Sequence, residues 1–129
     1  MKKAIILSLA LIFTMSNLFA QKVFSAKITS EDNNNFFVKE TNGNYYVTFE
    51  VTSLNNKQLS SLKSAIQNYR GVLSVTTSEI DIKTYFFKVE FYKFATNTRY
   101  YADFFKRNNI KKLIIDDKVV YPNELIETK

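Results

Sequence analysis

The chain has 129 residues, of which 46% are hydrophobic and 23% charged, and its formal net charge is +6 at pH 7. This length suits one domain and is short for two. Beyond residue 20 the sequence contains no cysteine, histidine, methionine or tryptophan, which excludes disulfide bridges and removes the commonest catalytic bases and soft-metal ligands.

Residues 1–20 have the pattern of a secretory signal peptide. Lys2 and Lys3 form a basic start, an apolar run follows up to Met15, and Ala20 is a small residue at the end. The apolar run is too short to span a bilayer. We therefore expect cleavage after Ala20, no membrane span in the remaining chain, and a location in the periplasm or outside the cell.

Two features are expected before the main domain. Val23–Thr29 alternates between apolar and polar residues, which predicts a short strand. Asn42-Gly43 lies between the strand-like runs Phe36–Glu40 and Tyr45–Val51. This arrangement predicts a hairpin with a type I′ turn, in which both central residues have positive φ. Alternate residues of the second run are apolar and should face the core.

Six elements are then predicted up to residue 121: a strand at Tyr45–Val51, a helix at Asn56–Tyr69, strands at Val72–Thr77 and Ile82–Phe94, a helix at Asn97–Asn108 and a strand at Leu113–Ile115. Gly71 should end the first helix, and Asp116-Asp117 should turn the chain back. This βαββαβ order predicts a ferredoxin-like α+β fold, with two helices on one face of an antiparallel sheet.

The domain boundaries follow from these elements. We predict a signal peptide at 1–20, an N-terminal strand and hairpin extension at 21–44, a ferredoxin-like domain at 45–121 and a C-terminal tail at 122–129. The first strand of a ferredoxin-like sheet is paired on both edges, so the hairpin competes with the last strand. Either the hairpin extends beyond the end of the sheet, or the last strand is displaced.

Several apolar and glycine positions follow a known spacing, namely Leu62 with Ile66, Gly71 with Val72, and Val75. They make the stretch from residue 45 to 115 resemble the heavy-metal-associated domain family, which has the copper-chaperone fold. Counting back places Asn55 and Gln58 where that family has the two cysteines of its Cys-x-x-Cys metal motif. The resemblance implies a metal-handling protein of the periplasm as one alternative function.

The residues themselves favour a different role for this pair. Amide side chains are poor ligands for soft cations. An Asn followed three residues later by Gln, just before an apolar run, is the pattern of a helix capping box. We therefore predict that Asn55 and Gln58 cap the first helix and that the protein uses no metal or other cofactor.

The outer face of the predicted sheet is a candidate partner-binding surface. It combines three aromatic side chains with polar and charged neighbours, and its candidate residues are Tyr46, Thr48, Phe86, Lys88 and Tyr92. The alternative is that these side chains support the sheet by pairing across strands, or that a neighbouring segment covers them.

The basic residues are scattered along the chain, including Arg70, Arg99 and Arg107. Such scatter is typical of a solvated surface rather than of a nucleic-acid patch. Asp103 and Arg107 are four residues apart, which predicts a surface ion pair on a helix. The sequence thus indicates an exported, non-catalytic binding module whose partner is an unknown envelope protein or ligand. A metal-handling protein is the alternative, and an enzyme ranks third.

Overall fold

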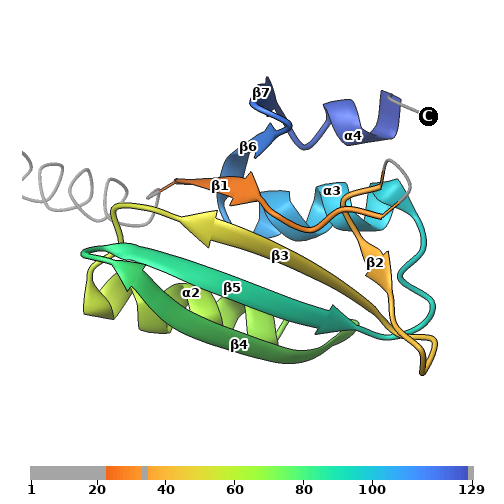
Figure 1. Cartoon of the computed structure of the whole chain (residues 1–129), viewed down its shortest axis with the longest axis horizontal. Coiled ribbons are helices and arrows are strands. Elements are labelled where there is room, and N and C mark those ends of the chain that lie inside the picture. The colour runs from red at the N-terminus through yellow and green to blue at the C-terminus, as the bar shows by residue number, and fades with distance from the viewer. Residues whose placement is uncertain (1–22, 33–34, 128–129) are drawn as a thin grey trace, which may run out of the picture.

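The computed structural model describes residues 23–32 and 35–127, which form an α+β domain built on one mixed β-sheet (Figure 1). The sequence prediction of a signal peptide concerns residues that lie outside this described part. The elements of the described part are β1 (Phe24–Ile28), β2 (Val38–Lys39), β3 (Tyr45–Val51), α2 (Asn56–Gln67), β4 (Val72–Asp81), β5 (Thr84–Phe91), α3 (Thr98–Arg107), β6 (Ile110–Ile115), β7 (Lys118–Val120) and α4 (Glu124–Glu127).

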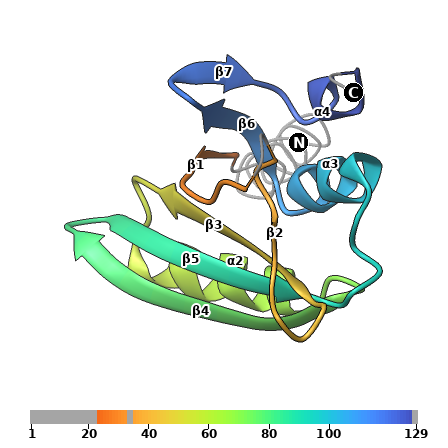
Figure 2. The same cartoon turned by 45° about the vertical axis from the view of Figure 1, so that its right-hand side comes forward.

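The strand order shows that the predicted ferredoxin-like fold is wrong. The order is β4-β5-β3-β1-β6-β7, and β2 also pairs with β3. In a ferredoxin-like sheet the last strand would pair directly with β3. Here β1 lies between them, antiparallel to β3 and parallel to β6, with Ala26 opposite both Val51 and Leu113. The result is a mixed seven-stranded sheet in place of an antiparallel sheet of four (Figure 2).

Two strands, β2 and β1, share one edge of β3, and each pairs with a different end of it. The hairpin strand β2 pairs only with Tyr45 and Tyr46, at the start of β3. The end of β3, from Phe49 to Val51, pairs with β1. The last strand, β6, is therefore displaced by one position, and the hairpin occupies only the other end of β3.

Turn geometry also differs from expectation. Gly43 has φ +94°, whereas Asn42 keeps a negative φ. The Gly43 amide donates to the carbonyl of Glu40 over 3.0 Å, so the loop is a type I turn followed by a left-handed glycine.

The turn between β6 and β7 contains two residues with positive φ, 53° at Asp116 and 65° at Asp117. Short Asp side chains tolerate this conformation, and the predicted turn there is confirmed.

The core lies on the face of the sheet that carries alternate residues of β3 and β5. Val47, Phe49 and Val51 are fully buried, as are Phe87, Val89 and Phe91. Leu62 and Ile66 of α2 and Tyr101, Phe104 and Phe105 of α3 belong to the same cluster. The predicted strand phases are confirmed, because alternation along a strand assigns each residue to one face.

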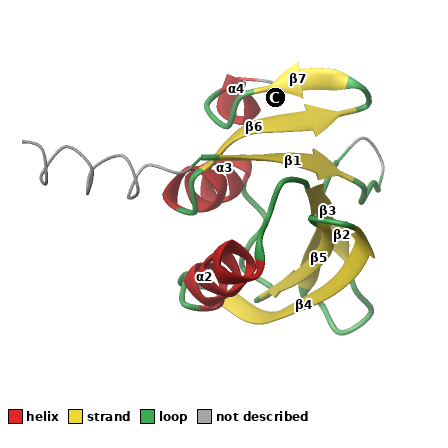
Figure 3. Ribbon diagram, turned by 90° about the vertical axis from the view of Figure 1, so that its left-hand side faces the viewer, coloured by secondary structure: helices red, strands yellow, loops and turns green. Residues whose placement is uncertain are grey.

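The two longer helices lie beside different parts of the sheet. Figure 3 shows α2 next to β4 and α3 next to β1 and β6. Leu125 of α4 is only 3% exposed, so the region predicted as a C-terminal tail contributes to the core. No helix within residues 23–32 and 35–127 is long and apolar enough to cross a membrane.

Candidate functional site

Asn55 and Gln58 form the capping box that the sequence predicts. The Asn55 side chain accepts a hydrogen bond from the Gln58 amide over 2.8 Å, and the Gln58 side chain accepts one from the Asn55 amide over 3.0 Å. Both side chains therefore satisfy backbone donors at the start of α2. In the described part of the chain, no group of three or more His, Cys, Asp or Glu side chains is placed to hold a metal ion.

The five candidate residues of the outer sheet face lie as the strand phase requires. Tyr46 and Thr48 of β3 neighbour Lys88 and Phe86 of β5, on the face opposite the buried residues. Tyr92 follows the end of β5 and is 45% exposed. The first four are half-buried.

Several polar groups of this face are already paired. The Lys88 ammonium lies 4.7 Å from the centre of the Tyr46 ring, and the Thr48 hydroxyl lies 2.6 Å from that of Thr29. The Ser74 hydroxyl donates to Glu90 over 2.7 Å and lowers the pKa of that carboxyl. These pairings are the cross-strand support that the sequence left open as the alternative to partner binding.

A second surface feature lies where the end of α2 meets α3. It is a groove of about 840 Å³ that is lined by all three arginines of the sequence and, within residues 23–32 and 35–127, by no lysine. A volume of this order is typical of ligand sites. We call it the arginine groove, and its lining residues are Asn68, Tyr69, Arg70, Asn97, Arg99, Tyr100, Asp103 and Arg107.

The local sequence places two of the three arginines on α3 and the third in the turn after α2. Arg99, Asp103 and Arg107 are spaced four residues apart, which places them along one side of α3. The Asn97 side chain accepts from the Arg99 amide over 2.7 Å and so fixes where the helix begins. Arg70 comes from the turn after α2, immediately before Gly71.

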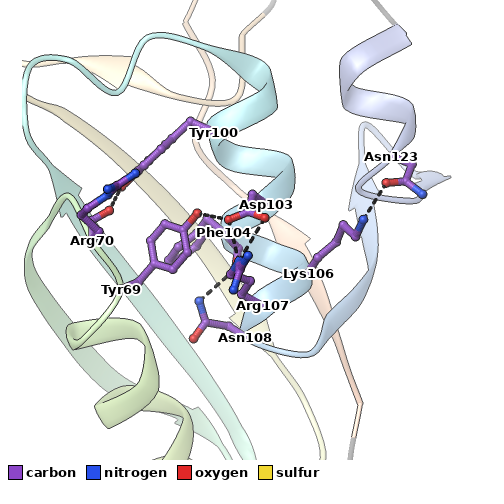
Figure 4. A network of polar contacts seen from close by, with 9 residues as sticks. All are labelled: Tyr69, Arg70, Tyr100, Asp103, Phe104, Lys106, Arg107, Asn108 and Asn123. Carbon is purple, nitrogen blue, oxygen red and sulfur yellow. Dashed lines mark hydrogen bonds and ion pairs between the residues drawn. The ribbon is translucent and has the colours of Figure 1, made fainter.

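A polar network fixes one of the arginines (Figure 4). The Tyr69 hydroxyl donates to Asp103 over 2.5 Å, and the Arg107 Nε donates to the same carboxylate over 3.0 Å. The hydrogen bond from Tyr69, aided by Arg107, holds the pKa of Asp103 below its usual range. Burial and this hydrogen bond raise the pKa of Tyr69. At neutral pH the pair is therefore a phenol and a carboxylate.

Tyr100 forms the wall of the groove next to Arg70. Its hydroxyl donates to the Arg70 carbonyl over 2.6 Å, and burial raises its pKa to about 12. The contact requires a glycine at position 71, because a Cβ there would lie 2.2 Å from the Tyr100 hydroxyl oxygen. Gly71 also has φ +100°, a conformation that other residues rarely adopt.

Arg70 and Arg99 differ from Arg107 in that their guanidinium groups have no hydrogen-bond or ion-pair partner within the described residues. Asp103 is the single acidic side chain among the described residues that line the groove, and it forms an ion pair with Arg107. The groove thus presents an excess of positive charge, carried by groups that bind carboxylate, sulfate or phosphate in a bidentate manner.

A neighbouring hollow of about 650 Å³ adjoins this groove and shares Asn97 and Arg99 with it. We call it the neutral hollow, since Arg99 is the single charged side chain among its described lining residues. These residues are Asn35, Phe37, Tyr45, Thr96, Asn97, Thr98, Arg99 and Ile126. The two hollows meet at the first turn of α3.

The sequence pattern does not reveal the arginine groove. The arginines are scattered among the more numerous lysines, which is typical of a solvated surface. A usable signal was present, because two of only three arginines lie at either end of one predicted helix. The position of Arg70 beside them depends on contacts between α3 and the turn after α2, which the sequence pattern does not contain. The predicted ion pair between Asp103 and Arg107 is confirmed.

Comparison with family models, with curated proteins and with solved structures finds no match for this chain.

Proposed function

We propose that the protein is an exported, non-catalytic binding module that holds an anionic ligand in the arginine groove. One observation carries the proposal: every arginine of the sequence lines this groove, and none of the lysines in the described part of the chain does. A surface that needed only solubility would use the two residue types interchangeably.

The difference between the two cations explains this distribution. Lysine carries a compact, strongly hydrated charge, whereas the planar guanidinium matches the two oxygens of a carboxylate, sulfate or phosphate. Arg70 and Arg99 supply the unpaired donors. Arg107 is bonded to Asp103, whose carboxylate also accepts from the Tyr69 hydroxyl, so part of the donor capacity of Arg107 is already used.

Export and the absence of catalysis belong to the same proposal. The pattern of residues 1–20 supports export, and the lack of histidine and cysteine after residue 20 supports binding without chemistry. The ligand would be a molecule or a protein of the cell envelope. The resemblance to the heavy-metal-associated family and the metal-handling alternative stay predictions.

Calorimetric titration of the purified protein with sulfate, phosphate and acetate tests the proposal. We expect at least one of these anions to bind, and Arg70→Lys or Arg99→Lys to weaken its binding about tenfold, because a charge-assisted bidentate contact contributes about 1.5–3 kcal/mol. These variants keep the net charge unchanged, so they separate guanidinium recognition from general electrostatic attraction.

Lys111→Ala is the matched control, because Lys111 is an exposed cation on β6, outside the groove. We expect it to leave anion binding unchanged. The proposal would be overturned if none of the three anions bound, or if Lys111→Ala weakened binding as much as the arginine variants did.

A further inference from the structure

The arginine groove ends at a wall that it shares with the neutral hollow. Asn97 and Arg99 belong to both. A ligand bound to Arg70 and Arg99 therefore has a second place to extend into, across the first turn of α3. The chemistry of that second place restricts what the ligand is.

The neutral hollow provides groups that both donate and accept hydrogen bonds. Thr96 and Thr98 contribute hydroxyls, Asn35 contributes an amide, and Tyr45 contributes a phenol. The side chain of Phe37 forms a rigid floor, because its ring stacks on Tyr101 at a centroid distance of 4.8 Å. This lining suits an uncharged group with several hydroxyls and one apolar face.

A repeating polyanion fits this arrangement poorly. A nucleic-acid strand carries a phosphate on every nucleotide and needs cations along its whole path. Apart from Arg99, none of the described side chains that line the neutral hollow carries a positive charge. The ligand must therefore be negatively charged at one end and neutral and polar at the other.

Building on the proposed function, we infer that the ligand is an acidic oligosaccharide. Its carboxylate or sulfate lies between Arg70 and Arg99 in the arginine groove. The adjoining uncharged sugar ring occupies the neutral hollow, where it bonds Thr96 and Thr98 and rests against Phe37.

The test compares glucuronate alone with a trisaccharide in which glucuronate is joined to two glucose units, by calorimetry on the purified protein. We expect the trisaccharide to bind about tenfold more tightly, because a few neutral hydrogen bonds are added.

Thr98→Val, which keeps the shape of the side chain and removes its hydroxyl, should reduce this gain about fivefold. It should leave the affinity for glucuronate unchanged. Thr76→Val, on the exposed part of β4, is the matched control.

The outcomes separate this inference from the function on which it depends. If glucuronate binds and the trisaccharide gains nothing, the saccharide inference is wrong and anion binding in the groove stands. If no anion binds, both are wrong. Tighter binding of a triglutamate peptide or of oligothymidylate than of the trisaccharide would also overturn the inference, in favour of an acidic peptide or a nucleic acid.

Discussion

At the scale of single residues, Gly71 contributes both to the turn after α2 and to the shape of the candidate site. Its left-handed backbone ends the turn after α2, and its missing side chain leaves room for the Tyr100 hydroxyl. That hydroxyl fixes the Arg70 carbonyl and, with it, the start of the arginine groove. One position thus serves both the turn and the wall of the groove.

We predict that Gly71→Ala lowers the free energy of unfolding by about 2–3 kcal/mol, from backbone strain of roughly 1–2 kcal/mol and the displacement of Tyr100. Gly43→Ala is the matched control. Gly43 has nearly the same φ, +94°, but a Cβ there meets no atom within 4 Å. Denaturant melts of both variants should therefore differ by the cost of moving Tyr100. If both variants lost the same free energy of unfolding, Tyr100 would be shown to move at no energetic cost.

At the scale of elements, the strands of the sheet combine a buried face with a face of paired polar side chains. Tyr46 lies under Lys88 across the strands. Tyr92 instead stacks on Phe94 beyond the end of β5, with the ring planes 7° apart and 5.7 Å between their centres. The two tyrosines named as partner-binding candidates therefore have different surroundings.

This difference gives a prediction for the outer sheet face. Tyr46→Ala should lower the free energy of unfolding by about 1 kcal/mol, through loss of the cross-strand contact with Lys88. Tyr92→Ala should change it by less, because the side chain is 45% exposed. Thermal melts measure both. If the face binds a partner, both variants should also weaken retention of envelope proteins in a pull-down while they remain folded.

The elements also show what a sequence pattern contains and what it omits. Alternation along Tyr45–Val51 and Thr84–Phe91 identifies the buried face correctly, because the side chains of a strand alternate whatever its neighbours are. The same alternation in Phe24–Ile28 does not say whether that strand lies at an edge or in the centre. The fold class was missed for this reason: β1 pairs on one side with a strand near the far end of the chain.

The candidate site was missed for a related reason. Helical spacing predicts that Arg99, Asp103 and Arg107 share one side of α3. It also predicts the ion pair between Asp103 and Arg107. Neither the approach of Tyr69 to Asp103 nor the position of Arg70 is local in sequence. The capping box of α2, in contrast, involves residues three apart, and the sequence predicts it fully.

At the scale of the whole molecule, burial of tyrosines should make the fold sensitive to alkali. Burial raises the pKa values of Tyr69, Tyr100 and Tyr101, in the case of Tyr100 to about 12. Because the folded state favours the protonated phenols, their contribution to stability is complete below pH of about 10 and is lost as the pH rises through the raised pKa values.

We therefore predict that the free energy of unfolding falls between pH of about 10 and about 12. Denaturant melts across this range, combined with absorbance of the phenolate, measure the effect. Tyr101→Phe should lower stability at neutral pH by about 1 kcal/mol, because the hydrogen bond to the Ala95 carbonyl is lost. It should also make the alkaline decline shallower. An unchanged decline would mean that Tyr101 does not contribute to it.

The central position of β1 has a consequence for how the chain reaches its fold. Contacts among β3, α2, β4 and β5 join segments that follow one another, so this half forms early. Strand β1 is synthesised first, yet its partner β6 is among the last elements to be made. We expect that β1 is not held firmly against β3 until β6 pairs with it, and that until then the edge of β3 has unpaired amides and carbonyls to which a strand from another molecule can bind. We expect aggregation during refolding to start at this edge, and a peptide with the sequence of β1 to suppress it.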